Sequence, residues 1–262
     1  MKSTERFSTR VEAYREHRPR YPKEVVELLR RECGLSPEWM VADVAAGTGL
    51  LAEIFLENGN RVIAVEPNAP MRAACEELRA KYSRLECVDG TAEATGLADG
   101  VADLVTVGQA MHWFDLEKTR AEFVRVLKPG GWCAVVYNHR RMGGDGFHDG
   151  YERLLVEYGG DYRAVQSKHM TDSKLAGFFA PGKMRSAVLP NYQELTREGL
   201  EGRVLSSSYM PQAGDAKYAA MMDAIAELFA RYAKDGVVRM EYETAVAWGM
   251  LAARAIAPSA PS

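Results

Sequence analysis

Cysteine is scarce in this sequence, and its few cysteines follow no pairing pattern. The 262 residues contain four cysteines, none in the C-x-x-C spacing of redox motifs and zinc sites. Three of them lie inside apolar patterns and are expected to be buried thiols. The histidines also lack ligand spacing such as H-x-x-x-H. The sequence therefore predicts no metal site, and reduced thiols favour a cytoplasmic location. The histidines other than His112 are His17, His139, His148 and His169.

An excess of positive charge is missing as well. The chain carries 33 basic and 36 acidic side chains, for a net charge of −3 and an isoelectric point of about 6.0. Proteins that hold a phosphate backbone normally need a basic surplus. Nucleic acid is therefore not expected as a partner.

Long hydrophobic runs are absent too. The longest obvious run, residues 132–137, has six residues, whereas a membrane-spanning helix needs about 20. The first six residues are charged or polar, with no apolar run behind them. We therefore expect neither an export signal nor a membrane span.

The chain does contain short apolar runs that alternate with amphipathic segments. This rhythm is typical of βαβ units around a parallel sheet. Gly59 is a plausible end for the first helix after the first strand. Strands are expected at residues 40–44, 61–65, 85–88, 102–107 and 132–138, and helices at 50–58, 69–81 and 116–127.

The flanking segments are less regular. Residues 7–21 are polar and aromatic and too polar to form core, and a helix is expected at 22–31. In the last expected strand, alternate residues share one face: Val238, Met240, Tyr242 and Thr244. Beyond residue 138 we expect a helix at 147–158, a strand at 183–189, a helix at 215–233 and a strand at 237–246.

Together these patterns predict one domain over residues 1–256. Its expected parts are an amino-terminal lid (1–21), a cofactor-binding core (40–138) and substrate-side insertions and helices (140–235). Residues 257–262 have nothing to pack and are expected to be disordered.

A loop of small residues leads from the first strand into the next helix. Residues 41–49 read VADVAAGTG, which allows a tight turn and a close approach of the backbone to a ligand. Glu66 ends the second strand nineteen residues after Gly47, where a carboxylate can accept hydrogen bonds from both ribose hydroxyls. With Gly49 and Ala52, this spacing fits the dinucleotide fingerprint G-x-G-x-x-A and S-adenosylmethionine equally well.

Charge separates these two cofactors. A nicotinamide dinucleotide brings an anionic pyrophosphate to the loop, whereas S-adenosylmethionine brings a sulfonium and an ammonium group. Asp43, at the end of the first strand, would repel the former and attract the latter. The same carboxylate could instead cap the backbone of the loop. We favour S-adenosylmethionine, and an NAD-dependent oxidoreductase and a non-catalytic cofactor-binding protein remain the alternatives.

With these residues, the chain resembles the class I S-adenosylmethionine-dependent methyltransferases of the type 11 kind, whose first motif reads roughly D-x-G-x-G-T-G. Residues 43–49 read DVAAGTG, with Ala45 at the first glycine position, a departure that matters if that residue needs a positive φ. Further matches are Glu66, the segment 91–93 and the turn 127–131. In this family the segment after the third strand cradles the adenine, usually with an acid where Thr91 stands.

The resemblance implies a Rossmann-like, doubly wound α/β fold. Its seven-stranded, mostly parallel sheet has an antiparallel last strand and helices on both faces. It also implies S-adenosyl-L-methionine as cofactor and a set of cofactor-binding residues. These are Tyr14, Arg18, Asp43, Ala45, Ala46, Gly47, Thr48, Gly49, Glu66, Pro67, Met71, Thr91, Ala92, Glu93, Gln109 and Ala110.

Other stretches resemble a narrower subgroup that includes trans-aconitate-methyltransferase-like proteins. They are residues 7–22, 108–114 and 206–209.

Methyl transfer from a sulfonium is an in-line displacement, so it needs orientation of donor and acceptor and at most one proton acceptor. His112 follows the fourth strand and could accept that proton near pH 7, or could only hydrogen-bond the cofactor or the backbone. Gln109 and Ala110 are expected under the methionine part of the cofactor. Trp113 and Phe114 would form an apolar wall around the adenine or the substrate.

The lid and the late segments supply further candidates for substrate binding. Tyr14, Arg18 and Tyr21 fit a lid over the cofactor, where Arg18 could pair with the cofactor's carboxylate or with a surface acid. The predicted substrate contacts are His112, Trp113, Tyr209 and Tyr21.

The expected enzyme transfers a methyl group to a small-molecule acceptor. A carboxylate acceptor is one option, because Arg140, Arg141 and Arg163 follow the fifth strand. The sequence does not predict the oligomeric state.

Overall fold

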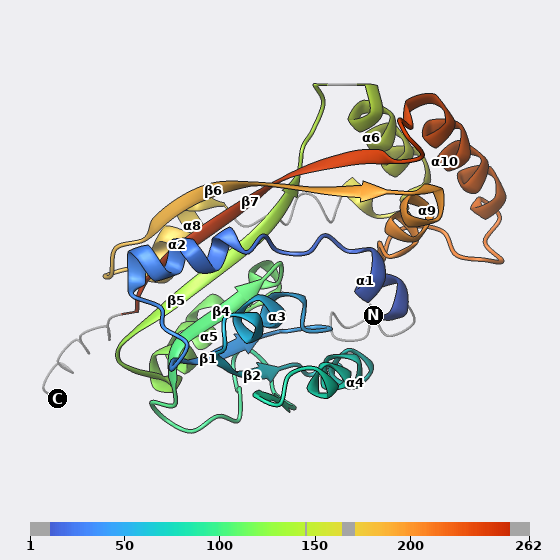
Figure 1. Cartoon of the computed structure of the whole chain (residues 1–262). Coiled ribbons are helices and arrows are strands. Elements are labelled where there is room, and N and C mark those ends of the chain that lie inside the picture. Colours follow the sequence, from blue (N-terminus) through green and yellow to red (C-terminus); the bar gives the residue numbers. More distant parts are fainter. Residues whose placement is uncertain (1–10, 145, 164–170, 252–262) are drawn as a thin grey trace, which may run out of the picture.

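The computed structural model describes residues 11–144, 146–163 and 171–251 (Figure 1). The expected tail 257–262, the first ten residues of the expected lid, and His169 lie outside these residues. A seven-stranded sheet in the order β3-β2-β1-β4-β5-β7-β6 runs through the molecule. Its strands are β1 Met40–Val44, β2 Arg61–Val65, β3 Leu85–Val88, β4 Ala102–Gly108, β5 Leu127–Arg140, β6 Arg185–Leu195 and β7 Val238–Met250.

The pairing of the strands matches the expected fold. Strands β1 to β5 are parallel to one another, and β7 is antiparallel to both β5 and β6. The four residues expected on one face of β7 are all buried. The doubly wound, mostly parallel sheet with an antiparallel last strand is thus confirmed.

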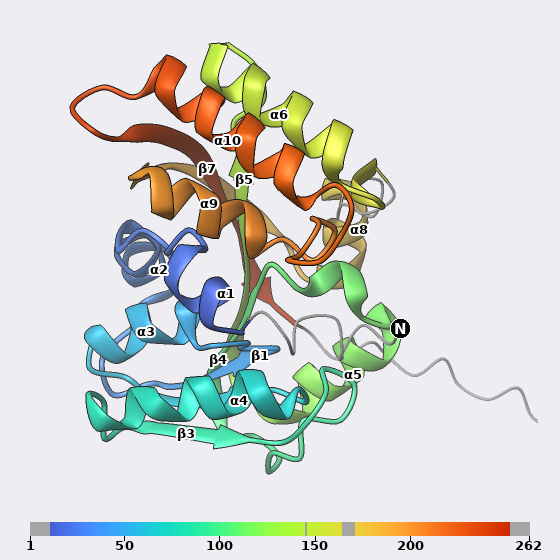
Figure 2. The ribbon, with the colours of Figure 1, turned by 90° about the vertical axis from the view of Figure 1, so that its right-hand side faces the viewer.

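Helices cover both faces of the sheet (Figures 1 and 2). On one face α2 and α3 pack on apolar residues of β1, β2 and β4, and on the other face α5 and α8 pack on the alternate residues of the same strands. The helices of this part are α1 Val11–His17, α2 Glu24–Cys33, α3 Leu50–Glu57, α4 Ala69–Glu76, α5 Leu116–Val126 and α8 Asp172–Phe179.

A separate helical cluster lies at the far end of β6 and β7 (Figures 1 and 2). Its helices are α6 Gly146–Tyr158, α9 Arg197–Leu205 and α10 Tyr218–Tyr232. They share an apolar core with the ends of β6 and β7, where Leu195, Met240 and Tyr242 are buried. This cluster therefore lies beyond the carboxyl ends of the parallel strands.

The expected boundaries are mostly met, and some need correction. The helix expected at 69–81 is α4 followed by a short 3-10 helix, Glu77–Ala80, and the strand expected at 183–189 extends to Leu195. The turn at 128–131 is a bulge inside β5, since Leu127 pairs with Ala102 and Trp132 with Leu104. Gly59 follows the end of α3 with a positive φ, as expected.

Two statements about burial were wrong. Two cysteines, Cys75 and Cys133, are buried, while Cys33 and Cys87 are half-buried, because the latter two lie at the margins of the sheet and of α2. The segment 7–21 was expected to stay out of the core, yet the ring of Tyr21 is 9% exposed and belongs to the core cluster of α2 and α3. The reason is an adjacent glycine, Gly108, which leaves room for the tyrosine hydroxyl.

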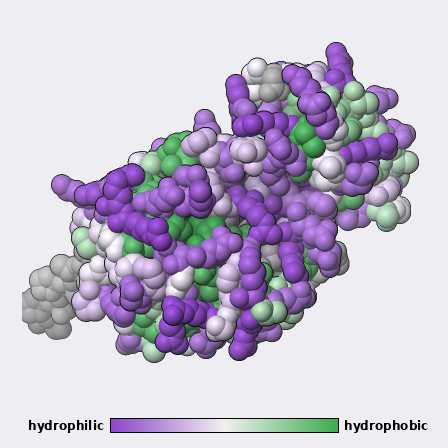
Figure 3. Space-filling view, viewed as in Figure 1, coloured by the Kyte–Doolittle hydropathy of each residue, from purple (hydrophilic) through white to green (hydrophobic). Residues whose placement is uncertain are grey.

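The surface in the view of Figure 3 is mainly hydrophilic, with apolar residues in small patches. Among the described residues no helix is long and apolar enough to cross a membrane.

Candidate functional site

A cavity of about 210 Å³ lies at the carboxyl ends of β1, β2 and β4. Residues just past these strands face it because successive parallel strands end at the same edge. Its lining residues are Tyr14, Ala45, Gly47, Glu66, Pro67, Asn68, Met71, Thr91, Ala92, Glu93, Gly108, Gln109, Ala110, Trp113 and Phe114. We refer to it as the strand-end pocket.

Eleven of the sixteen predicted cofactor residues line the strand-end pocket. The other five, Asp43, Ala46, Thr48, Gly49 and Arg18, do not. Trp113 and Phe114 form part of the wall, as expected for an apolar enclosure. Asn68 and Gly108 were missed, although Gly108 directly follows the strand predicted at 102–107 and Asn68 is the third residue after the strand predicted at 61–65.

The loop after β1 is held in a left-handed backbone conformation. Ala45, Gly47 and Gly49 have φ values of 56°, 59° and 86°. The Ala46 N–H donates to the carbonyl of Val65 at 3.1 Å, which ties the loop to β2. Ala45 therefore occupies the position where the departure from the glycine motif carries a conformational cost.

Replacing Ala45 by glycine is expected to stabilise the protein by about 0.5–1 kcal/mol. The left-handed conformation costs a non-glycine residue about 1–2 kcal/mol, and the greater freedom of glycine in the unfolded chain cancels part of that gain. Urea unfolding of the two proteins measures the difference. Ala46→Gly is the matched control and should destabilise, because the φ of Ala46 is not positive; a loss of stability in Ala45→Gly would contradict the assignment of strain.

Glu66 fastens this loop to the start of α4. Its Oε2 accepts a hydrogen bond from the Gly47 N–H at 2.9 Å, and its Oε1 accepts one from the Asn68 N–H at 2.8 Å. The side chain is buried, and this burial raises the pKa of Glu66 above its ordinary value, opposed by the two backbone N–H groups. The second lone pair of each oxygen remains available to a ligand.

Asp43 lies beneath the loop and does not line the pocket. Its Oδ1 accepts a hydrogen bond from the Thr106 hydroxyl at 2.8 Å. Its Oδ2 and the Thr48 hydroxyl are buried without a hydrogen-bond partner among the described residues. Burial raises the pKa of Asp43 to about 7, although the Thr106 hydroxyl and the Ala52 N–H favour the charged form. A bound cation nearby would therefore shift Asp43 toward its charged form.

The raised pKa of Asp43 predicts a pH-dependent loss of stability. The pKa of Asp43 is higher in the folded protein than in the unfolded chain, so protonation of Asp43 favours the folded state. This stabilisation is complete below about pH 4 and is lost as the pH rises through 7. Between pH 5 and pH 8 the free energy of unfolding of the wild type should fall by about 2–3 kcal/mol more than that of Asp43→Asn, because one pKa unit corresponds to about 1.4 kcal/mol. Urea unfolding at both pH values tests this, since Glu66 titrates in both proteins; parallel losses would contradict it.

The two charged side chains that line the strand-end pocket are both negative. Glu66 and Glu93 line it, and its lining contains no lysine, arginine or histidine among the described residues. Such a wall opposes a pyrophosphate and suits a cationic ligand.

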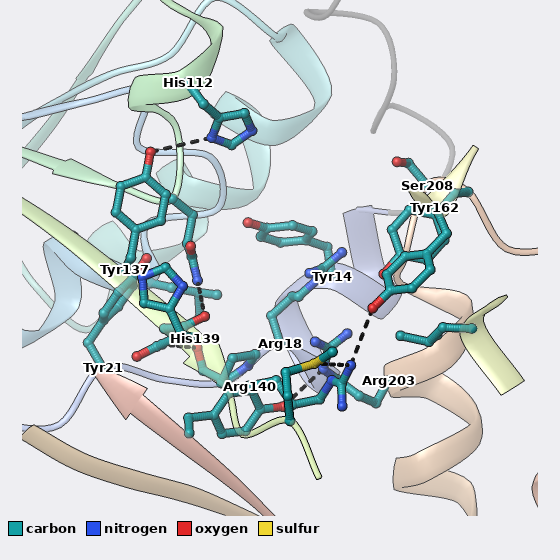
Figure 4. A pocket seen from close by; sticks show the side chains of 18 of the residues that line it. Tyr14, Arg18, Tyr21, His112, Tyr137, His139, Arg140, Tyr162, Arg203 and Ser208 are labelled. Carbon is teal, nitrogen blue, oxygen red and sulfur yellow. Dashed lines mark hydrogen bonds between the residues drawn. The ribbon is translucent and has the colours of Figure 1, made fainter. Parts of the chain in front are cut away.

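A second cavity, of about 370 Å³, adjoins the first through Tyr14, Gln109 and Trp113, which line both. We call it the arginine pocket (Figure 4). All four predicted substrate residues line it. Its other lining residues are Arg18, Pro19, Leu50, Tyr137, Asn138, His139, Arg140, Met142, Leu155, Tyr162, Arg203, Ser208 and Tyr242.

The arginines expected near the substrate are only partly brought together. Arg140 lines the arginine pocket and forms an ion pair with Glu152. Arg141 pairs with Glu241 outside the pocket, and Arg163 is exposed and does not line it. Arg203 was missed because only the packing of α9 brings it here.

His112 lies at one end of the arginine pocket (Figure 4). Its Nδ1 is 3.3 Å from the Tyr137 hydroxyl, and its ring contacts that of Trp113 with centroids 4.8 Å apart. Burial raises the pKa of Tyr137 well above its usual range, so this phenol stays neutral. Tyr137 in turn stacks on His139 at 5.6 Å.

The remaining histidines are not gathered around a metal. The buried His148 accepts a hydrogen bond at Nε2 from the Glu241 N–H, and His17 lies in α1. No group of His, Cys, Asp and Glu side chains suited to a metal ion occurs in residues 11–144, 146–163 and 171–251.

Comparison with known proteins bears on this geometry. Residues 42–135 match a family model described as a methyltransferase domain. An uncharacterized methyltransferase of Mycobacterium bovis is 38% identical over 134 residues, which are 51% of this chain and 52% of that protein. The chain thus matches about half the length of this relative. A methyltransferase-like protein of Schizosaccharomyces pombe is 28% identical over 242 residues, which are 91% of this chain and 92% of that protein.

The fold has a solved counterpart. A structure from Anaeromyxobacter dehalogenans, provisionally described as a type II methyltransferase, superposes with a TM-score of 0.61 at 23% identity, covering 89% of this chain and 98% of its own. Residues 42–135 are therefore similar to a methyltransferase domain, and the solved structure shares the fold.

Proposed function

We propose that the protein transfers a methyl group from S-adenosylmethionine, bound in the strand-end pocket, to a small-molecule acceptor bound in the arginine pocket. The observation that carries this proposal is the contrast between two adjoining cavities. One has only negative charges in its wall and the other has three arginines and no acid among its described lining residues. A cationic donor and an anionic or neutral acceptor would meet at the residues that the two cavities share.

The residues of the strand-end pocket fit the cofactor. Glu66 would accept hydrogen bonds from the ribose hydroxyls through its remaining lone pairs. The apolar side chains of Met71, Ala92 and Phe114 suit a flat adenine, and Gln109 and Ala110 would lie along the methionine part. Asp43 is buried beneath the loop and does not line the pocket, so its charge would act on the cofactor only across the loop. The bound cofactor would supply an electrophilic methyl group.

The protein's own contribution would be orientation, exclusion of water and the handling of one proton. Trp113 and Tyr14 stand where the two cavities meet and would keep donor and acceptor in line. His112 would accept a proton from the acceptor at the nitrogen not facing Tyr137. Both the catalytic role of His112 and the substrate roles of Tyr209 and Tyr21 stay predictions.

The resemblance of residues 7–22, 108–114 and 206–209 to trans-aconitate-methyltransferase-like proteins is likewise a proposal about subgroup. A cytoplasmic location also stays a prediction, supported by the unpaired cysteines. A nicotinamide-dependent oxidoreductase is disfavoured, because the carboxylates of Glu66 and Glu93 line the strand-end pocket and would repel a pyrophosphate.

Formation of S-adenosylhomocysteine tests the proposal. The purified protein is incubated with S-adenosylmethionine and a panel of small hydroxy, amino and carboxylic acids, and the product is measured by chromatography. We expect product that depends on one class of acceptor and that disappears in Glu66→Ala. Tight cofactor binding without product across the panel would instead support the non-catalytic binding protein.

A further inference from the structure

Two arginines come together in the arginine pocket without a carboxylate. Arg18 follows α1, and Arg203 lies on α9 and is 8% exposed. The Arg18 Nη2 donates to the Ser206 carbonyl at 3.0 Å, and its Nε is buried with no hydrogen-bond partner among the described residues. Arg203 donates from Nε to the Tyr242 hydroxyl at 3.2 Å and from Nη1 to the Ser207 hydroxyl at 3.4 Å. All these partners are neutral.

The charges of this pair are uncompensated within the described chain. No Asp or Glu of the described residues forms an ion pair with Arg18 or Arg203, whereas the nearby Arg140 is neutralised by Glu152. Burial and the charge of Arg203 lower the pKa of Arg18. Two buried like charges are costly unless an anion joins them, so the site lacks a negative partner.

The arrangement also separates the anion site from the reacting end of the pocket. Figure 4 shows Arg18 and Arg203 at one side of the cavity and His112 at the other, with Tyr14 between them. The Arg18 guanidinium lies over the Tyr14 ring at 5.0 Å, which fixes the orientation of its donors. An oxyanion held by guanidinium groups is a poor nucleophile, because its lone pairs are engaged and its charge is neutralised.

We infer that Arg18 and Arg203 bind an oxyanion, a carboxylate or phosphate, that anchors the acceptor, and that the methylated atom is a different group at the His112 end. This inference rests on the proposed function for the identity of the ligand as acceptor. The cavity of about 370 Å³ suits a small molecule that carries both groups.

Binding of simple aromatic anions tests the site. The probes are benzoate, phenyl phosphate and the neutral benzamide, measured by calorimetry at constant ionic strength on the full chain. We expect one of the two anions to bind at least about tenfold more tightly than benzamide, as charge-assisted hydrogen bonds imply. The better anion tells a carboxylate site from a phosphate site; binding of both anions no tighter than that of benzamide, or no binding of either anion, would overturn the inference.

Variants locate the effect. Arg203→Gln should weaken the preferred anion about tenfold, while Arg141→Gln, an exposed arginine paired with Glu241 outside the cavity, should change it less than about twofold. If Arg203→Gln does not fold, Arg18→Gln provides the same test. Equal losses in the Arg141 and Arg203 variants would count against the site.

A parallel titration with S-adenosylhomocysteine separates this inference from the proposed function. We expect Arg203→Gln to leave that affinity within about twofold. If it instead falls while binding of the preferred anion is unchanged, the arginines hold the cofactor's own carboxylate and the inference fails, although methyl transfer survives. If the wild type does not bind S-adenosylhomocysteine, the proposed function fails, and the titrations with the two anions still decide the anion site.

Discussion

Replacing Glu66 by alanine is expected to lower the affinity for S-adenosylmethionine at least about a hundredfold. The substitution would remove the acceptor for the ribose hydroxyls, and hydrogen bonds to a charged group contribute about 1.5–3 kcal/mol. It would also release the Gly47 and Asn68 N–H groups, which the carboxylate now holds at 2.9 and 2.8 Å. Calorimetric titration of both proteins measures the change.

Two further variants make this prediction specific. Glu66→Gln keeps one acceptor oxygen and should lose less affinity than Glu66→Ala. Glu86→Ala removes an exposed carboxylate from β3, outside the pocket, and should leave the affinity unchanged. An affinity that survives in a folded Glu66→Ala protein would show that the carboxylate only supports the loop.

Replacing Gly49 by alanine is expected to destabilise the fold by about 2–4 kcal/mol. At a φ of 86° an added Cβ is strained by about 1–2 kcal/mol. It would also lie 2.7 Å from the Leu78 Cδ1 and 2.8 Å from the Cys75 Sγ, an overpacking that costs about 1–3 kcal/mol. Urea unfolding gives the loss of free energy.

Gly34 offers a matched control for the backbone part. Its φ is 77°, and an added Cβ would meet nothing within 4 Å. Gly34→Ala should therefore lose only about 1–2 kcal/mol. Equal losses in the two variants would mean that α4 moves aside without cost and that the loop is not tightly packed against it.

The sequence predicted the central strands almost to the residue. Strands β1 and β2 have the expected bounds, because a strand buried on both faces leaves an apolar run between polar segments. The edge strand β3 also has the expected bounds. The edge strand β6 was predicted too short, since its outer residues are half-buried or exposed. Helix α9 was missed because Gly199 and Gly202 are poor helix formers. Gly202 is nevertheless required, since a Cβ there would collide with the His17 ring.

The residues of the candidate site also fall into two groups, those that the sequence could place and those that it could not. Residues that directly follow strands, such as Glu66 and Gln109, could be placed from the alternation of strands and helices alone. Asp43 could not, because its burial beneath the loop depends on α3. Arg203 reaches the arginine pocket only through the packing of α9 on β7, and local sequence patterns do not predict that packing.

We propose that the strand-end pocket binds an adenosyl sulfonium and not a dinucleotide. Calorimetric titration of the purified protein with S-adenosylmethionine and, separately, with NAD tests it most directly. We expect S-adenosylmethionine to bind one per chain and NAD to give no heat of binding, since the carboxylates of Glu66 and Glu93 in the wall of the pocket would repel a pyrophosphate. Binding of NAD together with no binding of S-adenosylmethionine would contradict the assignment of this pocket to an adenosyl sulfonium.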